Sequence, residues 1–439
     1  MRLRIGYQNM MYVFAHTISS RLQYVCNFIF VHHFGVPIAF TTDANEFAQA
    51  NGAKINYSNR HFEGDIIQIV PVPLLGENHI APQTIDCFSY NGCTAFFKTS
   101  DDRIPFDIFA ASFYLLSRYE EYLPFTPDEY GRFPHEDSIA WQQGFLNVPL
   151  INIWLQHFQK ILQQSFPALQ YKQRNFTWLP TYDIDIAYSY AHKGLIKNLG
   201  GFIKNPGLDR LQVVWFGKKD PYDCYEWLYK LHDTFDLKPI YFFLAAERNT
   251  RYDRQILPTA KAMQKLIAAH AEKYTIGIHP SWQSHKSVAT LLAEKITIEK
   301  LSSQNIVHSR QHYIKMLLPN TYQVLIEGNV LHDYSMGYGS INGFRASYAG
   351  SFYWYNLAKE IETNLCIHPF CFMDANSFFE QKQNVAQTQE EIAYYFKICK
   401  QVQGELITIF HNNILGTAAP FKGVAAMYEA LVEEISPAV

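Results

Sequence analysis

The chain has 439 residues, 48% of them hydrophobic and 18% charged, and its formal net charge is −3 at pH 7. A chain of this length is too long to form one ordinary hydrophobic core, so we expect two domains. The slightly acidic balance argues against a nucleic-acid-binding protein, whose surface would be basic. No run reaches the roughly 18 apolar residues that a membrane-spanning helix needs.

The cysteines and the N-terminus indicate in which cellular compartment the protein is expected. Seven cysteines are scattered without a CxxC pair, which is typical of reduced thiols rather than of a disulfide framework. Residues 1–7 lack the continuous apolar segment of a secretory leader. We therefore expect a cytoplasmic protein. Nothing in these patterns indicates an oligomeric state.

Residues 1–170 are predicted to form an N-terminal α/β domain. Its first expected elements are a helix and two short strands, over residues 12–33, 37–42 and 65–72. An apolar stretch from Asp107 to Tyr122 predicts a buried helix with Asp107 as its N-cap. We interpret Arg118, Glu120 and Glu121 in this stretch as a structural ion pair rather than as a site.

From residue 176 onward, short apolar strands alternate with helices. This alternation predicts a mainly parallel sheet, open or closed into a barrel, over residues 176–435. The strands are expected over residues 176–183, 238–244, 274–279, 305–309, 330–333, 365–373 and 405–411. A helix over residues 388–402 is predicted to begin with a capping box of Thr388 and Glu391.

Two carboxylates end the first of these strands, in the segment Thr181-Tyr182-Asp183-Ile184-Asp185. Side chains alternate along a strand, so Asp183 and Asp185 point to the same face, roughly 7 Å apart. Carboxylates this close repel each other unless a cation, a proton or a hydrogen-bond donor intervenes. Taken alone, the pair also fits a solvated strand end.

Polar residues recur where the other predicted strands stop. They are His279, Arg310, His312, Asp333, Asp374 and His411. In parallel α/β proteins the active site lies at the carboxyl ends of the strands. A single histidine at the end of a strand more often has a structural role than binds a ligand. Several polar residues at the ends of neighbouring strands, all at one edge of the sheet, together predict a functional site.

These motifs resemble those of the NodB-type polysaccharide deacetylases, which are metal-dependent carbohydrate de-N-acetylases with a deformed (β/α) barrel. The resemblance covers about residues 176–420. It implies that Asp183 is the general base, that Asp185 and His279 bind the metal, and that His411 is the general acid. Residues 106–122, followed by Gly131-Arg132-Phe133, resemble an uncharacterised domain that precedes such barrels in some bacterial proteins.

The family's second motif, which begins here with Ile278-His279-Pro280-Ser281, differs in this chain. Gln283 stands four residues after His279, where the family has a second metal-binding histidine. His285 and His312 are the alternatives for the third ligand. We favour His312, because it lies at a strand tip two residues after Arg310 and therefore on the same face.

An arginine is expected to orient Asp183, and both Arg310 and Arg345 fit the family's arginine motif. Asp333 or Asp374 would orient the ring of His411.

The expected cofactor is Zn²⁺, since carboxylate and imidazole ligands with open positions suit this ion. The backbone N–H of Tyr313 is a candidate oxyanion donor, and Trp282 is a candidate surface for a sugar ring.

The predicted function is metal-dependent removal of N-acetyl groups from an amino-sugar-containing polysaccharide or glycan precursor. One alternative is a catalytically inactive protein of the same fold that binds glycans or acts as a scaffold. Another is a metal-free hydrolase of cyclic amides, which would keep Asp183 and His411 but would not need Asp185.

Overall fold

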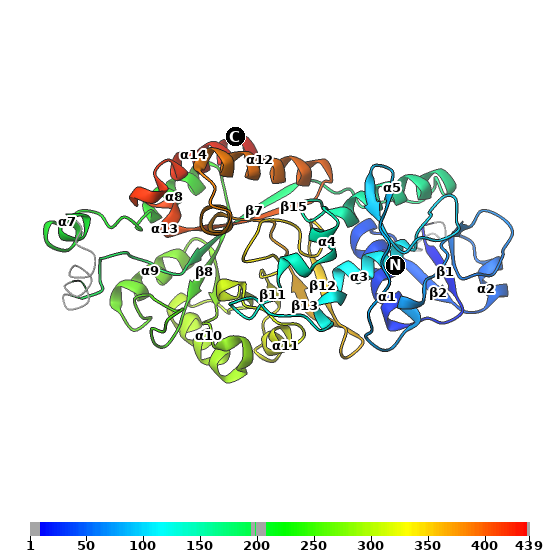
Figure 1. The fold of residues 1–439 in the computed structure, drawn as a ribbon, viewed down its shortest axis with the longest axis horizontal. Coiled ribbons are helices and arrows are strands. Elements are labelled where there is room, and N and C mark those ends of the chain that lie inside the picture. The colour runs from blue at the N-terminus through cyan, green and yellow to red at the C-terminus, as the bar shows by residue number, and fades with distance from the viewer. Residues whose placement is uncertain (1–8, 195–197, 199–207, 437–439) are drawn as a thin grey trace, which may run out of the picture.

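A computed structural model describes residues 9–194, 198 and 208–436, and it is organised around two sheets (Figure 1). Residues 1–7, which carry the prediction about a leader, lie outside the described residues. No helix in the described part of the chain combines the length and the apolar character needed to cross a bilayer.

The N-terminal part contains a four-stranded parallel sheet in the order β2-β1-β3-β4. Its strands are β1 (Met11–Ala15), β2 (Ile38–Thr41), β3 (Ala53–Tyr57) and β4 (Ile67–Gln68). A hairpin follows, formed by β5 (Phe88–Tyr90) and β6 (Cys93–Ala95). The helices of this part are α1 (Ser20–Cys26), α2 (Ala44–Gln49), α3 (Ile108–Leu116), α4 (Ile139–Gln142) and α5 (Leu150–Ser165).

The helix predicted over residues 12–33 is wrong over residues 12–19. Met11–Ala15 is a strand that pairs with both β2 and β3, because its β-branched and aromatic residues suit a position inside a sheet. The helix begins only at Ser20, where the Ser19 side chain accepts a hydrogen bond from the backbone N–H of Leu22. The predicted N-cap of α3 is confirmed, since Asp107 accepts from the backbone N–H groups of Phe109 and Ala110.

The second sheet has nine strands in the order β12-β13-β11-β10-β9-β8-β7-β15-β14, and only β12 runs antiparallel to its neighbour. The strands are β7 (Thr177–Ile184), β8 (Ile240–Leu244), β9 (Thr275–His279), β10 (His308–Ser309), β11 (His332–Asp333), β12 (Phe352–Asn356), β13 (Ile361–Ile367), β14 (Phe372–Met373) and β15 (Glu405–His411). The expected α/β class is confirmed. In the described part of the chain no strand pair joins β12 to β14, so hydrogen bonding does not close the sheet into a barrel.

Helices flank this sheet. In Figure 1, α12 and α14 lie on one side of the region of β7 and β15, whereas α9, α10 and α11 lie on the other. The helices are α7 (Leu208–Phe216), α8 (Tyr225–Thr234), α9 (Lys261–Ala271), α10 (Val288–Ser302), α11 (Asn320–Glu327), α12 (Val385–Gln401), α13 (Asn412–Leu415) and α14 (Val424–Ile435). Short 3₁₀ or π segments are η1 (Asn27–Phe34), η2 (Pro73–Gly76), η3 (Tyr119–Tyr122), η4 (His135–Asp137), η5 (Ser284–Lys286), η6 (His312–Ile314), η7 (Asn376–Glu380) and η8 (Ala419–Phe421).

Helix α12 begins earlier than predicted. Its capping box is formed by Asn384 and Gln387 rather than by Thr388 and Glu391. Glu391 is engaged elsewhere, because its carboxylate accepts hydrogen bonds from side chains that include Asn342. The pattern Asn-x-x-Gln therefore supplies the cap one turn before the expected one.

A buried ion network links the two parts of the chain. Arg118 and Arg345 both bind the carboxylate of Glu121, with N–O distances of 2.7 and 2.6 Å. Arg118 also pairs with Glu120 at 2.7 Å, so the structural interpretation of this cluster is confirmed. Apolar side chains of both parts belong to one continuous core. The N-terminal segment is thus held firmly against the larger sheet.

Candidate metal and hydrolytic site

Asp183 lies at the carboxyl end of β7, between β15 and β8. Its carboxylate is buried and accepts a hydrogen bond from Nη1 of Arg310 at 2.8 Å. Nε of the same arginine donates to the carbonyl of Tyr334 at 3.0 Å. Because a charge-assisted hydrogen bond constrains both partners, the orientation of Asp183 is determined by a side chain that is itself fixed.

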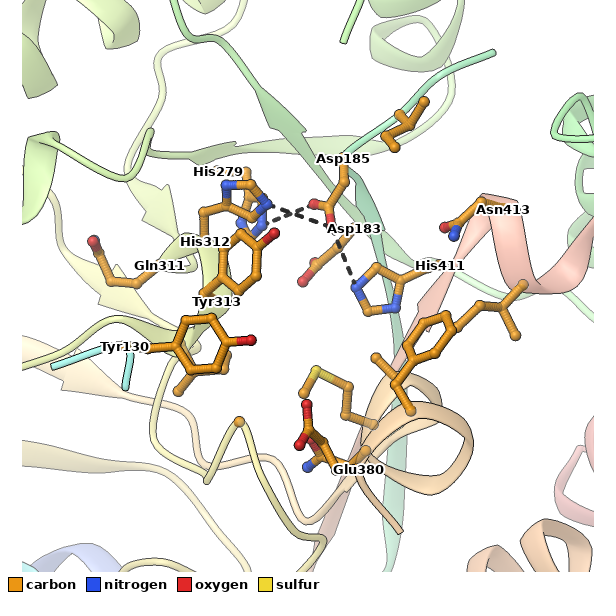
Figure 2. Close-up of a pocket in the computed structure, with 18 of the residues that line it drawn as sticks. Tyr130, Asp183, Asp185, His279, Gln311, His312, Tyr313, Glu380, His411 and Asn413 are labelled. Atoms are coloured by element: carbon orange, nitrogen blue, oxygen red, sulfur yellow. Dashed lines mark ion pairs between the residues drawn. The ribbon is translucent and has the colours of Figure 1, made fainter. Parts of the chain in front are cut away.

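Asp185 faces three imidazole rings (Figure 2). Its Oδ1 lies 3.1 Å from Nε2 of His279. Its Oδ2 lies 3.6 Å from Nε2 of His312 and 3.7 Å from Nε2 of His411. The rings come from the end of β9, from η6 after β10 and from the end of β15. Polar residues from the ends of several strands therefore converge on the carboxylate of Asp185.

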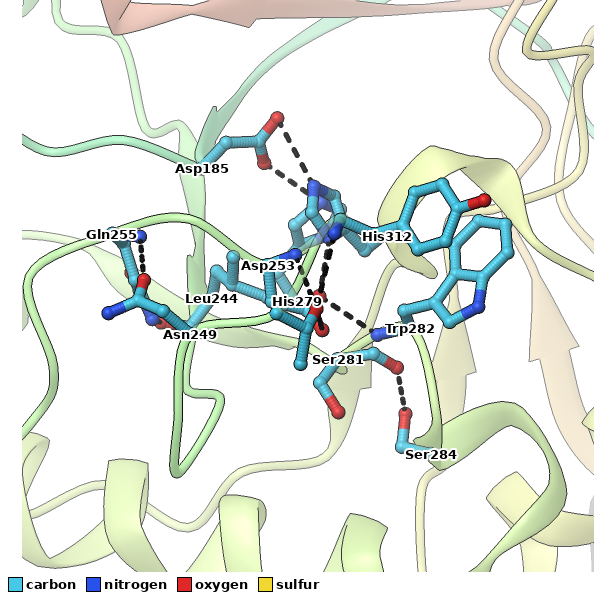
Figure 3. Close-up of polar contacts among 12 residues, drawn as sticks. Asp185, Leu244, Asn249, Asp253, Gln255, His279, Ser281, Trp282, Ser284 and His312 are labelled. Atoms are coloured by element: carbon cyan, nitrogen blue, oxygen red, sulfur yellow. Dashed lines mark hydrogen bonds and ion pairs between the residues drawn. The ribbon is translucent and has the colours of Figure 1, made fainter. Parts of the chain in front are cut away.

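The other ring nitrogen of each histidine has an acceptor. Nδ1 of His279 lies 2.6 Å from the carbonyl of Arg310. Nδ1 of His312 lies 3.0 Å from Oδ1 of Asp253 (Figure 3), and Nδ1 of His411 lies 2.5 Å from Oδ1 of Asp374. Carbonyl and carboxylate oxygens only accept, so each Nδ1 carries a hydrogen. Each Nε2 is therefore the atom left to bind an ion or to exchange a proton.

The donor set of Asp185, His279 and His312 fits a divalent metal ion. One ligand atom from each residue lies within 4.8 Å of the others. Oδ1 of Asp185 is buried without a hydrogen-bond partner in the described part of the chain. Two acceptors that face each other this closely need a cation or a proton between them. One oxygen and two nitrogen ligands with open positions suit zinc.

The carboxylates also control the charge of the imidazoles when no ion is bound. Burial acts to raise the pKa of Asp185, but attraction to His312 and His279 outweighs burial and holds this pKa well below its usual value. Burial lowers the pKa of His411, whereas Asp374 raises it more strongly, to about 10. His411 thus carries a proton near neutral pH, as a general acid must.

Three of the predicted residues lie apart from this cluster. Arg345 donates to Glu121 and to the carbonyl of Gly337 through all three of its guanidinium nitrogens, so Arg310 is the arginine that contacts Asp183. Asp333 accepts from the backbone and the hydroxyl of Ser335, and the carboxylate that binds His411 is Asp374.

The third of these residues, His285, has its Nδ1 2.8 Å from the carbonyl of Trp282. It does not join the donor set that surrounds Asp185.

Tyr313, the candidate oxyanion donor, and Trp282, the candidate sugar-binding surface, differ in position. Tyr313 lines a cavity of about 200 Å³ that also contains Asp183, Asp185 and His411. Trp282 lines neither this cavity nor the adjoining one. Its ring stacks on Tyr252 with centroids 3.8 Å apart, and its backbone N–H donates to Asp253 at 3.0 Å. Trp282 therefore supports the loops that carry the site.

The cavity continues into a neighbouring hollow of about 460 Å³. The two share Tyr130, Asp185, His312 and Tyr313, and the second adds Arg251 and Arg254. Together they form a groove that passes over the donor set and is open at one side.

Sequence reasoning missed one wall of this groove. Tyr130 stacks on Tyr313, with ring centroids 5.4 Å apart and an interplanar angle of 22°. Arg132 donates to the carbonyl of Tyr313 at 2.8 Å, and Lys315 donates to the carbonyl of Tyr130 at 2.9 Å. Tyr313 has a φ of 59°, a strained conformation that needs support from its surroundings. The N-terminal segment provides that support.

Sequence reasoning also missed Asp253, which lies in the loop after β8. It is buried and accepts from His312, from the backbone of Trp282 and from the hydroxyl of Thr250. A carboxylate that holds the distal nitrogen of a metal-binding histidine increases the basicity of that ligand. Asp253 stands well beyond the end of its strand, so no strand-tip pattern points to it.

Comparisons with known proteins cover the two parts of the chain separately. Residues 11–167 match the model of a family described as "Family of unknown function (DUF7033)". No curated protein matches.

Solved structures to which this chain is similar include a protein from Mycobacterium smegmatis assigned as a polysaccharide deacetylase, at 14% identity, over 61% of this chain and 85% of that one, with a TM-score of 0.41. A protein from Pseudomonas aeruginosa PAO1 with the same assignment is 12% identical over 60% and 85%, with a TM-score of 0.39. The allantoinase PuuE is 11% identical over 60% and 84%, also with a TM-score of 0.39. The function proposed below rests on the geometry of the site rather than on these neighbours.

Proposed function

We propose that this protein is a zinc-dependent hydrolase that removes N-acetyl groups from a glycan containing amino sugars. The observation that carries the proposal is the convergence of Asp185 with Nε2 of His279 and His312, beside the buried carboxylate of Asp183. Hydrolysis of an amide needs an activated water, stabilisation of the developing oxyanion and a proton for the leaving amine. The described side chains offer a base and an acid, and an ion held by the donor set would stabilise the oxyanion.

Asp183 is the proposed general base. A divalent ion held by Asp185, His279 and His312 would act as a Lewis acid toward the acyl carbonyl and the attacking water. Asp183, oriented by Arg310 at 2.8 Å, takes a proton from that water as its oxygen bonds to the acyl carbon. Arg310 presents only hydrogen-bond donors to Asp183, so it orients this carboxylate without accepting the transferred proton.

His411 is the proposed general acid. It faces the same cavity as Asp183, and its Nδ1 is engaged by Asp374. As the C–N bond breaks, Nε2 gives its proton to the leaving amine, and acetate and the free amino sugar result. Asp374 stabilises the imidazolium before the transfer and keeps Nε2 directed into the cavity.

The groove supports a glycan as the substrate. It is open at one side and is bordered by the stacked rings of Tyr130 and Tyr313. Tyrosine presents an apolar face together with a polar tip, which suits a sugar ring with its hydroxyl groups. Arg251 and Arg254 add hydrogen-bond donors further along the groove.

Acetate release tests the proposal. The zinc-loaded protein would be incubated with N-acetylated chitin oligomers, and acetate would be measured by a coupled assay. We expect release by the wild type and by Gln283→Ala, a change at an exposed position, and none by Asp183→Asn. Release of acetate by Asp183→Asn at the wild-type rate would contradict the assignment of the base. Equal hydrolysis of a cyclic amide with and without metal would favour the metal-free alternative.

A further inference from the structure

A second group of metal-ligand side chains lies outside the site described above. It consists of His332 on β11, Cys366 on β13 and His368 directly after β13, and one ligand atom of each lies within 4.8 Å of the others. His332 and Cys366 are partners in the parallel pairing of the two strands. His368 follows Cys366 by two residues, so all three side chains project from the same face of the sheet.

This group is separate from the site at Asp185. His308, which pairs with His332 across β10 and β11, precedes His312 by four residues, a distance of roughly 13 Å along an extended chain. The ring of Tyr334 stacks on His368, with centroids 4.4 Å apart, and lies 5.9 Å from the guanidinium carbon of Arg310. Tyr334 thus stands between the second group and the arginine that holds Asp183.

A hydrogen-bond chain sets the tautomer of His368. The hydroxyl of Ser351 donates to Glu405 at 2.7 Å. Having used its hydrogen, it accepts from Nδ1 of His368, also at 2.7 Å. The lone pair of Nε2 therefore points toward Nδ1 of His332, which lies 3.0 Å away. A carboxylate acting through a hydroxyl on the distal nitrogen is the kind of outer contact that orients a metal-binding histidine.

The rings are also fixed by stacking. His308 lies parallel to His332, with centroids 4.8 Å apart and an angle of 17°. The three side chains are only partly buried, so an ion from solvent can reach them.

We propose that His332, Cys366 and His368 form a second metal site, for an ion that prefers nitrogen and sulfur ligands, with zinc as the first candidate. Two imidazoles and one thiolate on neighbouring rigid strands match the three protein ligands of many zinc sites. The thiol would lose its proton when the ion binds. This inference is independent of the proposed hydrolase activity.

Cobalt(II) is a suitable probe, because only a site with a thiolate ligand shows sulfur-to-cobalt charge-transfer absorption in the near ultraviolet, and the site at Asp185 contains no cysteine. Equilibrium dialysis would count the bound ions. We expect two ions per wild-type chain, and one ion without that absorption in Cys366→Ser and in His332→Gln. Asp185→Asn should lose the other ion and keep the absorption.

Cys87→Ser is the matched control, because Cys87 is also a free and partly buried thiol, and it should keep both ions and the absorption. Far-ultraviolet circular dichroism would verify that each variant folds, and His332→Gln carries the test should Cys366→Ser unfold. The proposal is wrong if the wild type shows no thiolate absorption with cobalt. It is equally wrong if folded Cys366→Ser and His332→Gln retain both ions.

Discussion

Asp374 binds His411 twice. Its Oδ1 lies 2.5 Å from the ring Nδ1, and its Oδ2 accepts the backbone N–H of the same histidine at 2.7 Å. The two residues follow or end the adjacent strands β14 and β15. One carboxylate therefore fixes both the main chain and the ring of the proposed general acid.

Asp374→Asn should change the pH profile of hydrolysis. Asp374 raises the pKa of His411, and an amide removes that negative charge, so the pKa of His411 should fall. A general acid must be protonated, so kcat/KM of the variant should begin to decline at a lower pH than in the wild type. A pH–rate series on the zinc-loaded proteins measures this. If the rate is merely scaled down and the alkaline limb does not move, Asp374 has only a structural role.

Asp183 in β7 and Asp185 directly after it should have different functions. Asp183→Asn is expected to abolish turnover and retain the metal, because Asp183 binds Arg310 rather than the imidazoles. Asp185→Asn is expected to lose both activity and the ion of this site. Zinc bound after dialysis, measured together with acetate release, distinguishes the variants. The opposite pattern would mean that the roles of base and ligand are reversed.

His312 should be the third protein ligand. Its Nε2 faces Asp185 at 3.6 Å, whereas His285 is bound to the carbonyl of Trp282. In chelator competition, His312→Ala should weaken zinc binding strongly, and His285→Ala should leave it near the wild-type value. Asp253→Asn should weaken it roughly 10- to 100-fold, as is usual for the partner of a metal-binding histidine. A loss of affinity in His285→Ala alone would refute this ligand assignment.

Arg132 should act on substrate binding rather than on the metal. It holds the carbonyl of the strained residue Tyr313, so Arg132→Ala should loosen the groove wall. We expect a several-fold higher KM for chitin oligomers and an unchanged zinc affinity. Arg103→Ala is the control, because Arg103 is an exposed arginine of the same N-terminal segment that binds Ser165. Equal KM values for the two variants would show that Arg132 of the N-terminal segment does not affect substrate binding.

Glu294 should make stability depend on pH. Burial raises the pKa of this carboxyl, which accepts the backbone N–H of Ser281, to about 7. The native state binds the proton more tightly than the unfolded state, so this stabilisation is full below about pH 4.5 and is lost as the pH rises through about 7.

Glu294→Gln does not titrate, so its melting temperature relative to the wild type should rise between pH 5 and pH 8. The underlying change is on the order of 3 kcal/mol. Thermal denaturation at the two pH values provides the test, and a constant difference in melting temperature would contradict the raised pKa.

The sequence predicted those parts of the molecule that local patterns determine. The strand-tip residues Asp183, Asp185, His279 and His411 are brought to one edge because parallel strands align their carboxyl ends. Alternation of apolar runs with helices predicted most strands of the larger sheet, but the single strand expected over residues 365–373 is wrong, because β13 and β14 occupy distant places in the sheet. The antiparallel edge strand β12 was not predicted, although its aromatic run after Gly350 and Ser351 is a local strand signal.

Contacts between residues that are far apart in the sequence could not be predicted from such local patterns. Arg310 and Arg345 sit in similar motifs, and only the packing of Glu121 against Arg345 separates their roles. Tyr130 stacks on Tyr313 in the groove, although the two residues are 183 positions apart in the sequence. Met11–Ala15 was expected to begin a helix but is a strand, which its aromatic and β-branched residues favour and which neighbouring strands pair with at both edges.

An ion at Asp185, His279 and His312 is expected to make Asp183 and His411 catalytically competent. Metal-stripped protein carrying Cys366→Ser, which removes the second proposed site, would be titrated with zinc while acetate release from chitin oligomers is followed. We predict no release before zinc is added, a linear increase up to one equivalent, and a plateau thereafter. Full activity in the stripped protein, or none at any zinc concentration, would contradict this expectation.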